Sequence, residues 1–310
     1  MGATKVSDII VPEIINPYLI ERTSDKNIFI KSGIAMSDPS VSIPAGGKTI
    51  SIPFFKPVLA TPQVLSDTDA LPVNNISTDK DVAAIHAQGI AFGSNDLARL
   101  FAGADPMKAI GENLSDVWAR CMQDILLASL EGAMGATGMA ASINDQSSNV
   151  LDANIMSDSM FLLGDSYTNI SAVAMHTKVL SKLKQLDIVD FVCPSDMKTS
   201  YYTYMEKRVI VDDSLKPNEL GVYPIYLFGD GAFAYNESQE LASLETDRDI
   251  LAGEQILTSR RVFTMHPRGI RWIGTPAGHT PSIAELKNKS NWELVTERKN
   301  VSLAKILAKV

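Results

Sequence analysis

Residues 105–138, DPMKAIGENLSDVWARCMQDILLASLEGAMGATG, decide the fold. Asp105 is a favourable N-cap, and Pro106 stands at the first helical position, where proline is tolerated. Apolar residues then recur at steps of three and four, which marks one face of a helix. They are Met107, Ile110, Leu114, Val117, Trp118, Cys121, Ile125 and Ala128. The spacing predicts one helix over residues 105–133, about 40 Å long at about 1.5 Å per residue.

The sequence also predicts the polar face of this helix and the position of its C-terminal end. Much of the remaining surface is polar, at Glu112, Ser115, Asp116, Arg120 and Asp124. Gly132, Gly135 and Gly138 follow, and we interpret them as a helix stop and a flexible joint. Cys121 lies on the apolar face, where core packing is favoured over reactivity.

The first eighty residues contrast with this helix, because they hold eight of the fifteen prolines. These residues show no helical periodicity, and the pattern predicts short β-like segments at 27–34, 37–48 and 49–55. Residues 28–56 are hairpin-like, with a turn signal at Pro44-Ala45-Gly46-Gly47. Such a segment cannot easily bury its own apolar residues, so we expect the chain to complete its fold by assembling.

The rest of the chain contains both helix and strand patterns, and we expect an α+β protein. The expected helices are 94–101 with Ser94 as cap, 154–164, 178–186 with Thr177 as cap, and an amphipathic helix near 301–307. The expected strands are 170–176, 208–211, 222–228, 259–265 and 270–273, with a turn at 266–269. Residues 139–152 read as a loop, and 81–92 fit either strand or helix.

Composition narrows the class of protein. The net charge of −8 argues against a dedicated nucleic-acid binder, which would show a basic face. Cys121 and Cys193 are the only cysteines, which suggests a reducing compartment and is too few for a structural zinc site. The sequence shows neither a signal-peptide pattern nor an apolar run of about 18 residues, so we expect no membrane span.

No set of residues converges on catalysis. His176 could join a Ser-His-Asp triad, but no G-x-S-x-G frames a serine, and a structural role at a strand end is favoured. Acidic residues cluster at Asp67/Asp69, at Asp212/Asp213 and at Glu245/Asp247/Asp249. They lack EF-hand spacing and read as turn or surface acids.

Two further patterns are considered as phosphate-binding sites. The glycines at 132–138 lack the lysine of a phosphate-binding loop. Arg260-Arg261 could hold a phosphate, but with Glu254 nearby an ion pair within the protein or between subunits is favoured. We therefore predict no catalytic, cofactor-binding or metal-binding residues.

In order, the pieces resemble the major capsid proteins of tailed double-stranded-DNA bacteriophages, with the lambdoid-type capsid fold. The resemblance covers nearly the whole chain. The phrases that carry it are AVAMHTKVLSKL (172–183), KRVIVDDSL (207–215), YPIYLFGDGAFAY (223–235), ETDRD (245–249) and SRRVFTMHPRGIRWIG (259–274).

The resemblance implies how the chain is organised. Residues 1–27 would be an N-terminal arm, and 28–80 would contain an extended β-hairpin loop that lies over a neighbouring subunit. Residues 81–164 and 251–310 would form a peripheral domain with the spine helix at 105–133. Residues 165–250 would form the axial domain.

The resemblance also implies a function. The chain would be a structural coat protein, without enzyme activity or cofactor, that self-assembles as pentamers and hexamers into an icosahedral shell around double-stranded DNA. Its partners would be copies of itself, a scaffolding protein, a portal, decoration proteins and DNA bound without sequence specificity. Assembly would occur in the bacterial host cytoplasm. A bacterial nanocompartment shell protein and an enzyme with an unrecognised site remain alternatives.

Overall fold

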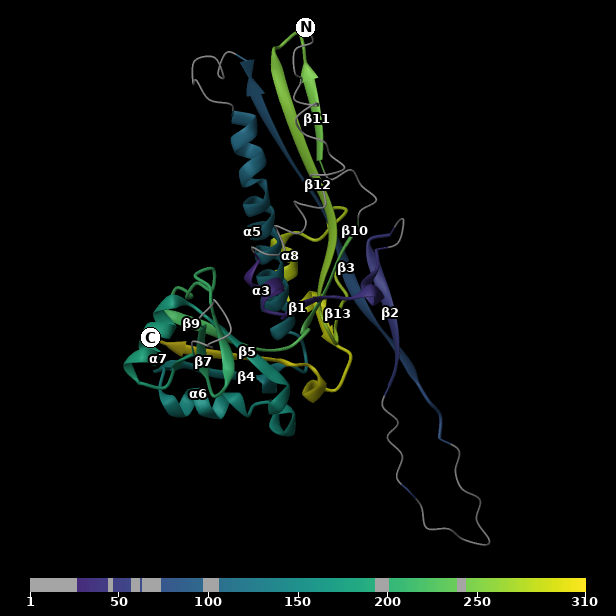
Figure 1. Cartoon of the computed structure of the whole chain (residues 1–310). Coiled ribbons are helices and arrows are strands. Elements are labelled where there is room, and N and C mark those ends of the chain that lie inside the picture. The colour runs from purple at the N-terminus through teal and green to yellow at the C-terminus, as the bar shows by residue number, and fades with distance from the viewer. Residues whose placement is uncertain are drawn as a thin grey trace.

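The long helix α5 (Pro106–Met134) runs beside the strands of one sheet and meets a second sheet near its C-terminal end (Figure 1). The computed structural model describes residues 27–43, 47–56, 62, 74–96, 106–192, 201–238 and 244–310. One part of the molecule is elongated and holds α5 beside long strands. The other part is rounder and holds the second sheet (Figure 1).

Helix α5 confirms the predicted long helix and its central burial. Trp118 is fully buried, and its Nε1 donates to Ser259 Oγ at 2.9 Å. Two assignments of faces were wrong, because Val117 is exposed and Ser115 is buried. The helix contacts more than one layer, so a second stripe is also buried, namely Met122, Leu126, Leu130 and Met134.

The first sheet has six strands and forms the elongated part. Its order is β1 (Ala35–Ser37), β10 (Phe233–Ser238), β12 (Glu254–Pro267), β3 (Thr78–Asn95) and β2 (Thr49–Phe55), with β11 (Leu244–Asp249) also paired to β12. Strand β3 pairs with β12 along its second half and with β2 along its first half. This double pairing settles residues 81–92 as strand.

The second sheet has seven strands. Its order is β4 (Ile143–Val150), β15 (Leu303–Lys309), β9 (Val222–Gly229), β5 (Ile170–Met175), β8 (Lys207–Val211), β7 (Tyr201–Tyr204) and β6 (Asp190–Val192). Val173 and Met175 pack in one cluster with residues of α6 (Ala153–Met160) and α7 (Thr177–Gln185). Ala172 and Ala174, on the other face of β5, join the cluster that contains α5.

Short elements complete the described chain. They are α3 (Ile28–Lys31), α8 (Ile283–Lys287), the two-stranded pair β13 (Ile270–Trp272) and β14 (Trp292–Leu294), and the 3₁₀ turns η1 (Pro39–Val41), η2 (Ala140–Ser142), η3 (Gly164–Asn169), η4 (Lys289–Asn291) and η5 (Arg298–Asn300). The predicted strands at 49–55, 170–176, 208–211, 222–228, 259–265 and 270–273 are confirmed within a few residues.

The prediction for the N-terminal quarter was wrong in its pairing. Residues 28–31 form a helical turn, because the Asn27 side chain accepts hydrogen bonds from the Phe29 and Ile30 amides. Strand β1 then pairs with β10 in parallel, instead of with residues 49–55. The hairpin is therefore β2–β3. Residues 44–46 of the predicted turn lie outside the described residues.

Two segments near the second sheet were also assigned wrongly. The predicted loop at 139–152 contains β4, which pairs in parallel with β15, and the predicted C-terminal helix is β15 itself. Strand β15 has a neighbour on each side, so backbone pairing outweighs a helical pattern of only a few residues.

Two of the three predicted helix caps were wrong, and the third, Asp105, lies outside the described residues. Ser94 lies within β3, so it caps no helix, and residues 97–101 lie outside the described part. His176, instead of Thr177, caps α7 by accepting the Lys178 amide at its Nδ1.

Gly132 and Gly135 are packing positions instead of a flexible joint. Gly132 lies inside α5, and a Cβ there would stand 2.0 Å from the Leu286 carbonyl oxygen and 2.5 Å from Trp292 Nε1. These two atoms are joined by a 2.7 Å hydrogen bond. A Cβ on Gly135 would meet Lys289 Cβ at 2.7 Å. The close approach of α8 and β14 requires Gly132, and the close approach of η4 requires Gly135.

Replacing Gly132 tests this packing. Ala normally stabilises a helix interior by about 1 kcal/mol over Gly, but at this position overpacking, typically about 1–3 kcal/mol or more, opposes that gain. We expect Gly132→Ala to lower the free energy of unfolding of the free subunit in a urea titration. Gly93→Ala is the control, because a Cβ there meets nothing within 4 Å. Equal stability of both variants would contradict the packing role.

Candidate assembly surfaces

The β2–β3 hairpin projects from the elongated sheet as a two-stranded stem (Figure 1). Its pairing runs from Thr49↔Ala84 to Phe55↔Thr78, and the Lys56 amide adds a hydrogen bond to the Ser77 carbonyl. Toward the outer end Phe55 is 75% exposed and Ile76 is 64% exposed. A two-stranded ribbon is marginal by itself, so its outer end needs a surface that this part of the chain does not provide.

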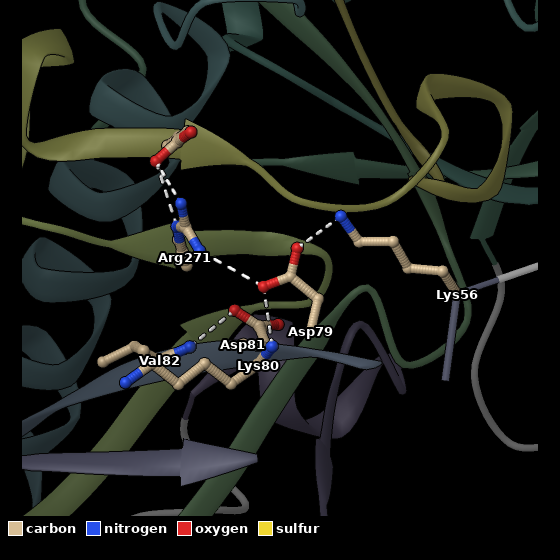
Figure 2. A network of polar contacts seen from close by, with 7 residues as sticks. Lys56, Asp79, Lys80, Asp81, Val82 and Arg271 are labelled. Atoms are coloured by element: carbon tan, nitrogen blue, oxygen red, sulfur yellow. Dashed lines mark hydrogen bonds and ion pairs between the residues drawn. The ribbon is translucent and has the colours of Figure 1, made fainter. Parts of the chain in front are cut away.

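A network of charges ties the outer part of the paired stem, beside Phe55, to the first sheet's neighbour β13 (Figure 2). Asp79 on β3 contacts Lys56 at 2.9 Å and Arg271 on β13 at 3.4 Å. Arg271 also donates from Nη2 and Nε to Glu293 Oε2 on β14, at 2.7 and 3.0 Å. The hydrogen bond from Lys56, with that from the Lys80 amide, lowers the pKa of Asp79. The network joins β3 to the β13–β14 pair.

A second anchor lies deeper. The Asp81 carboxylate lies 3.0 Å from His266 Nε2 and accepts the Gly269 amide at 3.0 Å and the Val82 amide at 2.9 Å. Burial acts to raise the pKa of Asp81, but these contacts outweigh it and hold that pKa below its ordinary value. Hydrogen bonds to a buried carboxylate are the condition under which its charge is tolerated. Asp81 therefore clamps β3 to the turn after β12.

His86 lies further along β3 and is buried without a partner for its Nδ1 among the described residues. Its ring packs beside Phe263 at a centroid distance of 5.6 Å. Burial, with a smaller effect from His266, lowers the pKa of His86 to about 4. The residue is thus a neutral core histidine at neutral pH.

The residues weighed for catalysis have structural partners. His176 caps α7, and its Nε2 lies 3.6 Å from Asp213. Asp213 also accepts from Thr177 Oγ1 at 2.5 Å, and the hydrogen bonds to Thr177 lower the pKa of Asp213. Asp212 accepts from Gln123 on α5. The structure thus brings His176 and Asp213 together as a helix-start contact.

The acidic cluster on β11 is likewise paired. Glu245 forms an ion pair with Arg260, and Asp249 accepts the amides of Leu251 and Ala252 in the turn that follows. In the described ranges no group of three or more metal-ligating side chains occurs. Asp67 and Asp69 lie outside those ranges.

The arginine pair makes ion pairs within the protein, as favoured, but not with Glu254. Arg260 pairs with Glu245. Arg261 is buried, 3.5 Å from Glu237 and over the Trp118 ring at 5.4 Å. Cys121 is half-buried, and burial, aided by Asp124, raises the pKa of its thiol to about 11, which fits packing over reactivity.

Apolar side chains are exposed at other edges too. Ile250 and Leu251, at the turn between β11 and β12, are 83% and 100% exposed. Phe161 and Tyr167 form an exposed ring pair with centroids 4.9 Å apart. No helix in the described part of the chain has both the length and the hydropathy needed to cross a bilayer.

Comparison with known proteins identifies the family. The model of the major capsid protein 13-like family matches residues 74–302. The chain is 37% identical to the major capsid protein of Bacillus phage SPP1, over 98% of this chain and 97% of that protein. Its fold is similar to a chain of Mycobacterium phage Che8 (TM-score 0.55, 12% identity, 91% of each chain) and to one from the cyanophage Pam1 capsid asymmetric unit (TM-score 0.54, 10% identity, 85% of each chain).

The fold, with its long helix, two sheets and projecting hairpin, is therefore that of a phage capsid subunit. The chain belongs to the major capsid protein 13-like family and is a structural shell protein. This agrees with the resemblance found in the sequence.

The anchors of the hairpin could not be found from the sequence. Asp81 and His266 are 185 positions apart, and Asp79 and Arg271 are 192 apart. Alternation along residues 78–95 fits a strand, but nothing local shows which distant residue faces a given carboxylate. Asp81 and His266 lie just beyond the last paired residues of β3 and β12, Ile85 and Thr264, and Arg271 reaches Asp79 from β13.

The deeper anchor should matter more than the surface one. Asp81→Asn leaves a buried network incomplete, and we expect a loss of about 2 kcal/mol in the free energy of unfolding. Asp79→Asn affects a solvent-screened network, for which a clearly smaller loss is expected. Urea unfolding and hydrogen exchange of the β3 amides would measure both. A larger loss for Asp79→Asn would show that the ranking of the two anchors is wrong.

His86 should make subunit stability depend on pH. Because its folded pKa of about 4 lies below the unfolded value of 6.5, the unfolded chain binds a proton that the folded chain does not. Stability should therefore fall as pH drops from 6.5 toward 4, by about 2 kcal/mol at pH 5. His86→Gln should make the free energy of unfolding depend less on pH in this range, whereas His279→Gln, at an exposed position, should not. An unchanged slope in His86→Gln would exclude this cause.

Proposed function

We propose that copies of this chain assemble as pentamers and hexamers into a closed icosahedral shell around double-stranded DNA. The observation that carries the proposal is the β2–β3 stem, which leaves the long sheet with Phe55 and Ile76 uncovered. An apolar ribbon end of this kind is stabilised when it packs on a neighbouring copy. Repetition of such contacts under closed symmetry gives a strong container from individually modest interfaces.

The two sheets suggest the division into domains. The peripheral domain would comprise α5 as spine helix with the first sheet, and the axial domain would comprise the second sheet. The axial domain then includes β4 and β15 from outside residues 165–250, while β10 and β11, inside that range, go to the peripheral domain. Residues 1–27 would form the N-terminal arm, and the extended loop of 28–80 would be the β2–β3 hairpin.

The proposed partners follow from the role of a shell. They are a scaffolding protein, a portal, decoration proteins and DNA bound without sequence specificity, with assembly in the bacterial host cytoplasm and no membrane step. The net charge of −8 supports weak contact with DNA, because each basic contact to phosphate would strengthen binding and hinder entry and exit. We propose a structural role without enzyme activity, which the internal pairing of His176 and Asp213 supports.

The nanocompartment alternative is disfavoured. The relative that aligns over nearly the whole chain is a phage major capsid protein, and the family match has the same description. Both point to a virion shell instead of an enzyme container.

Shortening the hairpin tests the proposal. Replacing residues 58–73 with Asn-Gly, a favoured hairpin turn, leaves β2, β3 and both anchors in place. We expect the free subunit to keep its circular dichroism spectrum and urea midpoint but to form no closed shells in electron micrographs. Subunits with Asn-Gly inserted after Gly278, in an exposed loop, serve as a control and should assemble. Normal shells from the shortened chain would contradict the proposal.

A further inference from the structure

A cavity of about 560 Å³ lies where α5 meets the second sheet. Its walls come from one face of α5, the loop at 214–218, strands β9 and β15, and α8. Leu127, Pro217 and Pro224 contribute apolar surface, and Ile283, also in the lining, is 46% exposed. Sites for small groups or peptide side chains have this size and mixed lining.

The lining is richer in cations than the chain as a whole. Lys216, Lys287 and Lys305 contribute three positive charges, against the two carboxylates of Asp124 and Glu131. Lys287 is already paired with Glu131 at 3.0 Å. The cavity therefore carries net positive charge on a chain whose net charge is −8.

Lys305 is the group best placed to receive an anion. It lies in the middle of β15, half-buried, with its ammonium 5.4 Å from the Tyr226 ring centroid. No carboxylate of the described residues lies within ion-pair distance of it. Burial lowers the pKa of Lys305, and the more distant charges of Glu131 and Asp145 offset this only in part. A partly buried ammonium of this kind gains from a carboxylate that enters the cavity.

The chain contains a segment of matching chemistry at the end of the hairpin. Residues 57–73, PVLATPQVLSDTDALPV, carry Asp67 and Asp69 and no lysine or arginine. The sequence of this segment also contains the apolar residues Val64, Leu65 and Leu71. The stem that bears this segment leaves the first sheet away from the second sheet (Figure 1), so the cavity of another copy is the one that its direction favours.

We propose that the cavity beside Lys305 receives the hairpin segment at residues 63–73 of a second copy, with Asp67 or Asp69 paired to Lys305. The inference rests on the proposed function, since it names the surface on which the hairpin of a neighbour docks. The apolar residues of the segment would cover the walls formed by Leu127, Pro217 and Ile283.

Zero-length crosslinking tests the contact directly. A carbodiimide converts a carboxylate to an O-acylisourea, and an amine within ion-pair reach attacks the acyl carbon, releasing the urea and forming an amide. Shells assembled from an equal mixture of ¹⁴N and ¹⁵N chains would be crosslinked, digested and analysed by mass spectrometry. We expect a peptide that joins Lys305 to Asp67 or Asp69 and contains mixed isotopes. If every linked peptide contained only one isotope, the contact would be intramolecular and the proposal would be overturned.

Matched variants provide the second arm. Lys305→Met keeps the length of the side chain and should slow shell assembly, followed by light scattering, at least ten-fold. Lys309→Met, on the same strand but outside the cavity lining, should not. Lys305→Glu should assemble poorly alone and recover when Asp67→Lys and Asp69→Lys are added. Circular dichroism of the free subunits separates these effects from misfolding.

The outcomes distinguish failure of the docking site from failure of the proposed shell function. Wild-type shells with no Lys305 link, together with normal assembly of Lys305→Met, would overturn the docking site while leaving the shell function intact. Failure of the wild-type chain to form shells would instead contradict the proposed function itself.

Discussion

The structure depends on the packing of two sheets against one helix. Helix α5 supplies Met122, Leu126 and Leu130 to a cluster that includes Phe263 from the first sheet and Phe228 from the second. Because α5 packs against both sheets, the sheets share a core, and neither would bury its inner face without the helix. Gly132 brings α8 and β14 onto the same rod. The hairpin projects from a frame that this shared core makes rigid.

The projecting hairpin is held by polar contacts. Asp81 links β3 to His266 and Gly269 within the protein, and Asp79 adds a partly exposed link to Arg271. Buried, fully satisfied carboxylates fix geometry because the alternatives leave a charge unpaired. An element that makes few apolar contacts of its own thus has a defined direction at its root. A shell subunit needs this property, since small angular errors add up over many copies.

Sequence reasoning succeeded where local periodicity is strong. The three- and four-residue spacing from Leu114 to Ala128 specified α5, and β-rich runs specified β5, β8, β9 and β12. It failed where partners are distant. Strand β15 has a pattern compatible with a helix, and Asn27 converts a β-rich run into a helical turn through one side-chain cap. The anchors of the hairpin depend on contacts between residues nearly two hundred positions apart, which no single-sequence pattern encodes.

The central claim is that the chain is complete only among its copies, with the hairpin of each subunit resting on the next. Electron cryomicroscopy of particles formed by the purified full-length protein tests this most directly. We expect closed icosahedral shells in which density for the β2–β3 hairpin crosses onto a neighbouring subunit. Monomers or small open oligomers, or shells in which every hairpin folds back onto its own subunit, would contradict it.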